Sequence, residues 1–167
     1  IFINSKSNYT YAIIVSEPQT SIIKRFSKNF TISNNNILIR ANGVAEGMYF
    51  DALVDSDIVN NNINIISDGS AYGIAACNVF GNLYGLKIDS NEIFVNSRDM
   101  SYLIEIFRCN DCKVLNNYIN GFSNGVYGIG VYNSEGILIK RNEISVCGLN
   151  LTNSTPADAL GKGNSAI

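Results

Sequence analysis

The chain has 167 residues, 46% of them hydrophobic and 16% charged, which is enough apolar material for a core and argues against a disordered chain. Its 12 basic and 14 acidic residues leave a net charge of −2 and no basic stripe, so nucleic acid is not an expected partner. The most apolar window, residues 72–86, is broken by asparagine and glycine and is shorter than the ~20 apolar residues that cross a bilayer, so we expect no membrane insertion.

A repeat organises the chain from its first residues onward. Residues 3–15 contain Tyr11-Ala12-Ile13, a tyrosine two residues before an aliphatic residue, and this pattern recurs later. From residue 32 a second pattern returns every 25 to 30 residues and reads aliphatic, two residues, Asn, one residue, Ile. Its five copies occupy residues 32–37, 58–63, 88–93, 114–119 and 139–144. An internal repeat of this length is typical of a solenoid.

Each of the first four copies of the asparagine pattern is followed after 10 or 11 residues by a member of another apolar column, formed by Met48, Ile74, Ile104 and Ile129. Apolar residues alternate within each stretch, as in Ile63 and Ile65, which is the period of a β-strand. Such short strands bury their inward side chains only if successive coils stack at ~4.8 Å. The sequence therefore predicts an all-β fold, a parallel β-helix of about six coils with three short strands each.

The aligned asparagines predict a specific turn between the first two strands of a coil. A turn of so few residues needs a left-handed backbone, which asparagine tolerates, and stacked asparagines can also hydrogen-bond along the axis. The simpler reading, that asparagine only marks loops, explains its abundance but not its register. We therefore predict a side-chain ladder of Asn35, Asn61, Asn91, Asn117 and Asn142. A second column, Tyr72, Tyr102 and Tyr127, is expected to stack as well.

Departures from the repeat mark the predicted loops. Insertions are expected at residues 16–29 and 148–163, with a smaller one around residues 81–84. The chain begins and stops inside a coil, so we expect residues 1–167 to be one segment of a longer solenoid, able to join flanking coils or to associate end to end. Four glycosylation sequons occur, at Asn8, Asn29, Asn150 and Asn153. Asn150 and Asn153 are expected to be the more accessible, because they lie in the second long loop.

The repeats resemble those of the pectate-lyase-type right-handed parallel β-helix. Their Asn-Asn-x-Ile and Tyr-Gly-Ile segments are also similar to asparagine-rich repeats of adhesin-like surface proteins, including those of methanogenic archaea. The first resemblance implies that the asparagine turn is T2 and that the strands at Ile88, Ile93 and Ile104 belong to sheets PB2, PB3 and PB1. It also implies that functional residues lie on the outer face of PB1, between the T1 and T3 loops.

Alternation from the inward column predicts which side chains face outward on that sheet: Tyr49, Asp51, Ala75, Cys77, Glu105, Phe107, Gly130 and Tyr132. Asp51 and Glu105 are the candidate catalytic carboxyl groups, with backbones expected about 11 Å apart. Tyr49, Phe107 and Tyr132 are candidate stacking surfaces for sugar rings. The chain has no histidine and this face has no larger acidic cluster, so no cofactor and no metal ion is predicted.

The four cysteines leave two readings open. Cys109 and Cys112 form a lone CxxC, whereas structural zinc needs four ligands, and Cys77 and Cys147 belong to other strands and coils. Cys112 falls in an inward column, which indicates a buried, inert thiol. A disulfide of Cys109 with Cys112 or with Cys77 is the alternative in an oxidising compartment.

Three functions are compatible with these patterns. The leading hypothesis is an extracellular or cell-surface, adhesin-like segment without enzymatic activity, a rigid rod that binds carbohydrate or a surface partner. The alternative is a polysaccharide-processing enzyme of the lyase, hydrolase or phage-tailspike type, with its site on the outer PB1 face. A scaffold whose asparagine and tyrosine columns are purely structural is the third.

Overall fold

The computed structural model describes residues 1–16, 27–51, 53–77 and 83–148, and within them it contains twenty β-strands and no helix. Sheet A holds β1 (Phe2–Ser5), β5 (Asn36–Ala41), β9 (Asn62–Ser67), β13 (Glu92–Ser97), β17 (Tyr118–Ser123) and β20 (Glu143–Gly148). Sheet B holds β2 (Tyr9–Val15), β6 (Val44–Phe50), β10 (Ala71–Cys77), β14 (Met100–Phe107) and β18 (Gly125–Tyr132). Sheet C holds β3 (Ser27–Lys28), β7 (Leu53–Val54), β11 (Leu83–Tyr84) and β15 (Cys109–Asn110). Sheet D holds β4 (Thr31–Ser33), β8 (Asp57–Val59), β12 (Lys87–Asp89), β16 (Lys113–Leu115) and β19 (Leu138–Lys140).

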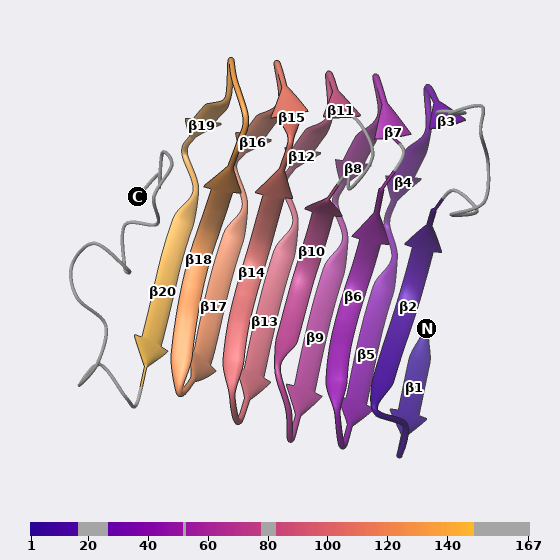
Figure 1. The fold of residues 1–167 in the computed structure, drawn as a ribbon, viewed down its shortest axis with the longest axis vertical. Coiled ribbons are helices and arrows are strands. Elements are labelled where there is room, and N and C mark those ends of the chain that lie inside the picture. Colours follow the sequence, from indigo (N-terminus) through magenta and orange to yellow (C-terminus); the bar gives the residue numbers. More distant parts are fainter. Residues whose placement is uncertain (17–26, 52, 78–82, 149–167) are drawn as a thin grey trace.

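The chain visits the four sheets in the order A, B, C, D and then starts the next turn (Figure 1). Strands of successive turns pair in parallel within every sheet. This confirms the predicted parallel β-helix, which is right-handed (Figure 1). Each of the first four turns also carries a short strand of sheet C that the sequence did not predict. Within the described chain, four turns contain a strand of every sheet, and β17, β18, β19 and β20 continue the stack. The sequence predicted about six coils of three strands each.

The interior is filled by aliphatic columns that run along the axis. Ile37, Ile63, Ile93 and Ile119 lie in register on sheet A, and all are fully buried. The predicted inward column of sheet B is buried as well, with Ile129 the most exposed member at 5%. Full burial of one such side chain contributes about 1.5–3 kcal/mol. The stacking of turns, rather than any single strand, therefore stabilises the fold.

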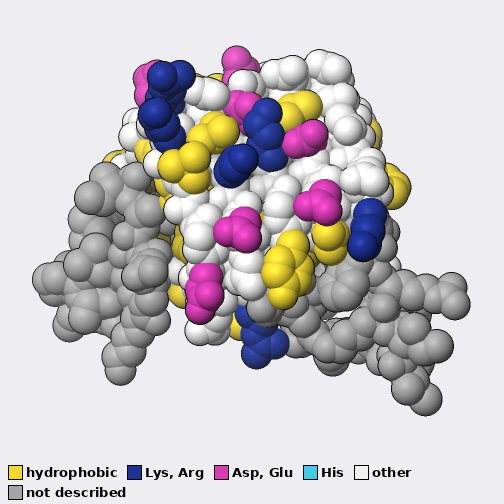
Figure 2. Space-filling model, turned by 90° about the horizontal axis from the view of Figure 1, so that it is seen from above, with side chains coloured by type: hydrophobic (Ala, Val, Ile, Leu, Met, Phe, Trp, Pro, Cys, Tyr) yellow, Lys and Arg dark blue, Asp and Glu magenta, His cyan; other side chains and the backbone are white. Residues whose placement is uncertain are grey.

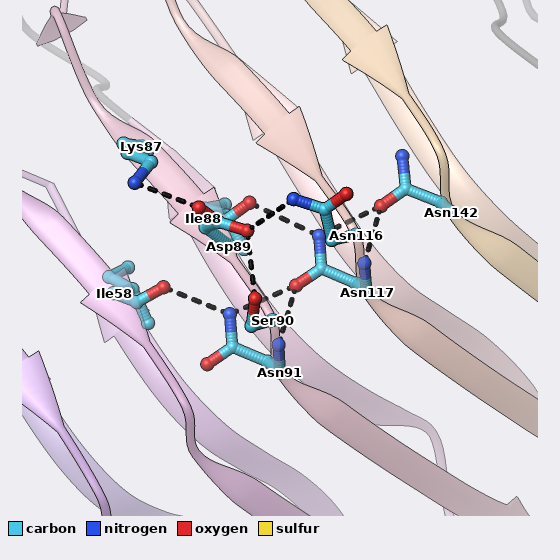
Figure 3. Close-up of polar contacts among 9 residues, drawn as sticks. All are labelled: Ile58, Lys87, Ile88, Asp89, Ser90, Asn91, Asn116, Asn117 and Asn142. Atoms are coloured by element: carbon cyan, nitrogen blue, oxygen red, sulfur yellow. Dashed lines mark hydrogen bonds and ion pairs between the residues drawn. The ribbon is translucent and has the colours of Figure 1, made fainter.

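The predicted asparagine ladder is confirmed (Figure 3). The Asn91 Nδ2 group donates to the Oδ1 of Asn117 at 3.0 Å and to the carbonyl of Ile58 at 2.9 Å, while the Asn91 backbone N–H donates to the same Oδ1. The Oδ1 of Asn91 in turn accepts the backbone N–H and the Nδ2 group of Asn61, each at 3.0 Å. Equivalent bonds link the remaining ladder members from Asn35 to Asn142. The ladder thus joins all five of these turns.

The left-handed backbone of this turn belongs to a different residue than expected. The residues with positive φ immediately precede the ladder, with φ between 52° and 58°: Asn34, Asn60, Ser90, Asn116 and Arg141. Our assignment of that conformation to the ladder asparagines was therefore wrong. The two roles divide between neighbours, because the preceding residue bends the chain and the ladder side chain is free to point inward and bond along the axis.

Of the readings that the sequence left open for the cysteines, the structure shows the disulfide between Cys109 and Cys112. Cys109 and Cys112 form a disulfide with their Cα atoms 6.1 Å apart, so Cys112 is not a free thiol. Both residues are fully buried. Cys77 and Cys147 are free, the first half-buried and the second exposed.

Several predicted features fall on parts of the chain that the structure does not describe. The loop at residues 148–163, apart from Gly148, lies outside the described residues, as do residues 17–26 of the first insertion and the sequons Asn150 and Asn153. Asn8 and Asn29 are described and exposed. Figure 2 views the side of the solenoid where the strands of sheet C lie, and acidic and basic side chains are interspersed on this side. No described segment is a helix long and apolar enough to cross a membrane.

Candidate functional site

A depression of about 290 Å³ opens on the outer face of sheet B. Its walls come from the four neighbouring strands β2, β6, β10 and β14 and from Ser70 beside β10: Tyr9, Val44, Glu46, Tyr49, Ser70, Tyr72, Ala75, Cys77 and Glu105. This is the face on which the strand pattern and the pectate-lyase-type resemblance place functional residues. The depression is therefore the candidate site.

The first cause of the depression is an interruption in the tyrosine column. Tyr72 stacks on Tyr102 with ring centroids 5.5 Å apart, and Tyr102 stacks on Tyr127 at 4.6 Å, both pairs with planes 7° apart. In the preceding turn the register position beside Tyr72 is occupied by Glu46, and one turn earlier by Tyr11. The stack therefore ends at Tyr72, because Glu46 carries no ring to cover it.

The second cause is a small residue in the next outward row. Tyr49, Ala75 and Glu105 lie side by side on β6, β10 and β14. Ala75 is 2% exposed, yet its methyl group is far shorter than the side chains on either side. Tyr49 and Glu105 therefore stand as opposite walls above a low floor.

Glu46 was not among the residues predicted to face outward. Strict alternation from the buried Met48 places Glu46 inside, but the intervening Gly47 is also buried, so two consecutive residues face the interior. A Cβ atom at Gly47 would lie 2.6 Å from the carbonyl oxygen of Gly73 and 2.6 Å from a methyl group of Ile63. The turns approach closely at this glycine, and the strand changes phase here, as it also does in β14, where Leu103 and Ile104 are both buried. The signal was present in the sequence as Glu46-Gly47 aligned with Tyr72-Gly73.

The two carboxyl groups of the site are both poorly solvated. Burial, and secondarily the charge of Glu105, raise the pKa of Glu46 to about 7. The Glu46 Oε2 atom is buried and has no hydrogen-bond partner within the described part of the chain. Burial also raises the pKa of Glu105, while the Cys77 thiol, 3.5 Å from its Oε2 atom, donates a hydrogen bond that opposes the rise. Burial and the same carboxylate raise the pKa of the Cys77 thiol, which stays protonated.

The structure brings together only some of the predicted site residues. Tyr49 and Glu105 line the depression, whereas Asp51, Phe107 and Tyr132 are not among the residues that form its walls. Asp51 is near enough for its charge to help raise the pKa of Tyr49, after burial as the larger cause. The candidate carboxyl pair of the depression is therefore Glu46 with Glu105, in place of Asp51 with Glu105.

Phe107 and Tyr132 are engaged by neighbouring side chains. The guanidinium carbon of Arg108 lies 5.0 Å from the centre of the Phe107 ring. The Tyr132 ring meets Tyr102 edge to face at 6.5 Å, and after burial the nearby Tyr132 hydroxyl is the next cause that raises the pKa of Tyr102. Both residues extend the aromatic surface of sheet B beyond the depression. Within the described ranges no group of three acidic, cysteine or histidine side chains is arranged to hold a metal ion.

Comparison with known proteins gave no match: no family model, no curated protein and no solved structure is significantly similar to the chain. The likeness to pectate-lyase-type and adhesin-like proteins therefore rests on the repeats themselves. Any functional conclusion has to come from the geometry of the depression.

The depression offers three kinds of contact to a ligand. The Tyr72 ring supplies a flat apolar face, the Glu105 carboxylate accepts hydrogen bonds, and Glu46 exchanges a proton near neutral pH. The hydroxyl groups of Ser70 and Tyr49 add donors and acceptors at the rim. Such a mixture of one apolar surface and several polar groups suits a ligand with one apolar and several hydroxylated faces.

Proposed function

We propose that the chain is a segment of an extracellular or cell-surface, adhesin-like β-helix, a rigid rod that binds carbohydrate on the outer face of sheet B. The observation that carries the proposal is the Tyr72 ring at the end of the tyrosine stack, with carboxyl groups beside it. Sugar rings pack their C–H faces on aromatic rings and direct their hydroxyl groups to polar side chains.

The rest of the fold supports this proposal. The continuous stack of parallel strands and the asparagine ladder hold the site on a rigid surface, which limits the entropy lost on binding. The Cys109–Cys112 disulfide is typical of a chain that folds in an oxidising compartment, as surface proteins do. The similarity of the repeats to adhesin-like surface proteins favours the same setting.

A glycan array followed by titration calorimetry tests the proposal. We expect wild-type protein to retain at least one oligosaccharide, and Tyr72→Ala to weaken that binding about five- to tenfold, since a stacked ring contributes ~1–1.5 kcal/mol. Tyr84→Ala is the matched control, because Tyr84 is 44% exposed on sheet C and does not line the depression. Failure of every glycan to bind, or equal losses in the two variants, would contradict the proposal.

The paired carboxyl groups favour a second candidate, a polysaccharide-processing enzyme. A group with a pKa of about 7 can act as a general acid at neutral pH, and Glu46 has such a pKa beside a second carboxyl group, Glu105. Release of new reducing ends or unsaturated products from a polysaccharide panel would support catalysis, provided that Glu46→Gln and Glu105→Gln abolish it. Absence of cleavage in wild-type protein across the panel would reject the enzyme and leave the binding proposal intact.

A further inference from the structure

Among the described residues, those that line the walls of the depression include two acidic side chains, Glu46 and Glu105, and no basic one. The ion pair between Lys87 and Asp89 lies on sheet D, away from these walls. Glu46 and Glu105 moreover repel each other, and the buried Oε2 atom of Glu46 lacks a hydrogen-bond donor from the described residues. A ligand that brings a positive charge and donors would relieve both penalties.

The surroundings of the carboxyl groups indicate which kind of cation fits. A calcium ion takes six to eight oxygen ligands, and the described residues hold no group of three candidate ligands. The walls contributed by Tyr49 and Tyr72 are aromatic instead, and an organic ammonium is attracted to an aromatic face as well as to carboxylates. The two carboxylates also repel an acidic sugar such as a uronate. The site therefore favours a ligand with an ammonium group and disfavours an anionic one.

We propose that the depression binds a primary ammonium group, presented by a carbohydrate with a free amino sugar. This inference rests on the proposed carbohydrate binding and names its ligand class. The sugar ring stacks on Tyr72, and its ammonium group donates to Glu46 and Glu105. Binding to an ammonium holds Glu46 in its ionised form, so a complex formed at pH 6 releases protons from the site.

Calorimetric titration with glucosamine oligomers and with N-acetylglucosamine oligomers of equal length tests the inference at pH 6 and physiological salt. The two ligands differ in the ammonium group and share the sugar ring. We expect wild-type protein to bind the free amine about tenfold or more tightly, because the acetylated oligomer cannot make the hydrogen bond of a charged ammonium group. Titrations in buffers of different ionisation enthalpy should show proton release with the glucosamine oligomer only.

Variants test whether the preference for the free amine comes from the two carboxyl groups of the depression. Glu46→Gln and Glu105→Gln should each lose most of the preference for the free amine, so that their affinities for the two oligomers become similar. Glu143→Gln is the matched control, because Glu143 is an exposed acidic residue on sheet A away from the depression. Circular dichroism spectra identical to wild type establish that the variants are folded.

The outcomes separate this inference from the proposed function. Equal wild-type affinity for the two oligomers, or a preference that survives in Glu46→Gln and Glu105→Gln, overturns the ammonium site and leaves carbohydrate binding standing. No binding to any glycan overturns both. A lysine peptide that binds as tightly as the glucosamine oligomer would show that the sugar ring contributes nothing, which also overturns the assignment of an amino sugar.

Discussion

Replacement of Asn91 with alanine tests the asparagine ladder at its most buried position. The Asn91 side chain is 0% exposed and makes four hydrogen bonds: it accepts two from Asn61 and donates one each to Asn117 and Ile58. At ~1 kcal/mol each, their loss should lower the free energy of unfolding by about 4 kcal/mol. Part of that cost arises because the backbone N–H of Asn61 loses its acceptor inside the solenoid.

Equilibrium unfolding in urea, followed by circular dichroism, measures this change. The matched control is Asn64→Ala, because Asn64 is an exposed asparagine on sheet A and lies outside the ladder. The control should change stability by less than ~0.5 kcal/mol. A loss below about 1 kcal/mol for Asn91→Ala, or a loss equal to that of Asn64→Ala, would refute the view that the ladder stabilises the stack.

Three further predictions concern the close approach of turns at Gly73, the disulfide and the carboxyl group of Glu46. A Cβ atom at Gly73 would clash with the carbonyl oxygen of Leu103, whereas one at Gly125 would meet nothing within 4 Å. Gly73→Ala should therefore destabilise the protein by about 1–3 kcal/mol in the same unfolding assay, and equal effects of the two glycine variants would contradict the close approach of turns. Thiol titration of the unfolded, unreduced chain should find two free cysteines, and replacement of both Cys109 and Cys112 by serine should cost ~2 kcal/mol; four titratable thiols would disprove the disulfide. Since burial and the neighbouring carboxylate raise the pKa of Glu46 from 4.5 to about 7, the folded chain holds more protons than the unfolded chain in that window, and the free energy of unfolding should fall as the pH rises through it. Glu46→Gln should flatten this part of the pH profile, and an unchanged slope would show that Glu46 is not buried as described.

Much of the fold could be predicted from the sequence because each turn repeats one geometry. Where a side chain must meet its copy in the next turn, the same residue type recurs at the same place, as with Asn61 and Asn91 in the ladder or Tyr72 and Tyr102 in the stack. The inward aliphatic columns follow from the two-residue period for the same reason. A repeat therefore indicates contacts between turns as well as the presence of strands.

The remaining features depend on single positions, where a repeat carries no information. The strands of sheet C have only two residues each, too few to show a period. Glu46 faces outward because Gly47 and Met48 are both buried, a change of phase that alternation alone does not reveal. The site arises where the columns are broken, at Glu46 in the tyrosine column and at Ala75 between Tyr49 and Glu105. Column analysis locates such breaks, but which way the broken position faces depends on the backbone.

A crystal structure of the protein with the oligosaccharide that binds most tightly on the array tests the central claim most directly. The account predicts a sugar ring stacked on Tyr72, with polar contacts to Glu46 and Glu105 on the outer face of sheet B. A ligand bound on another sheet, or a depression that stays empty while the ligand is bound elsewhere, would contradict it.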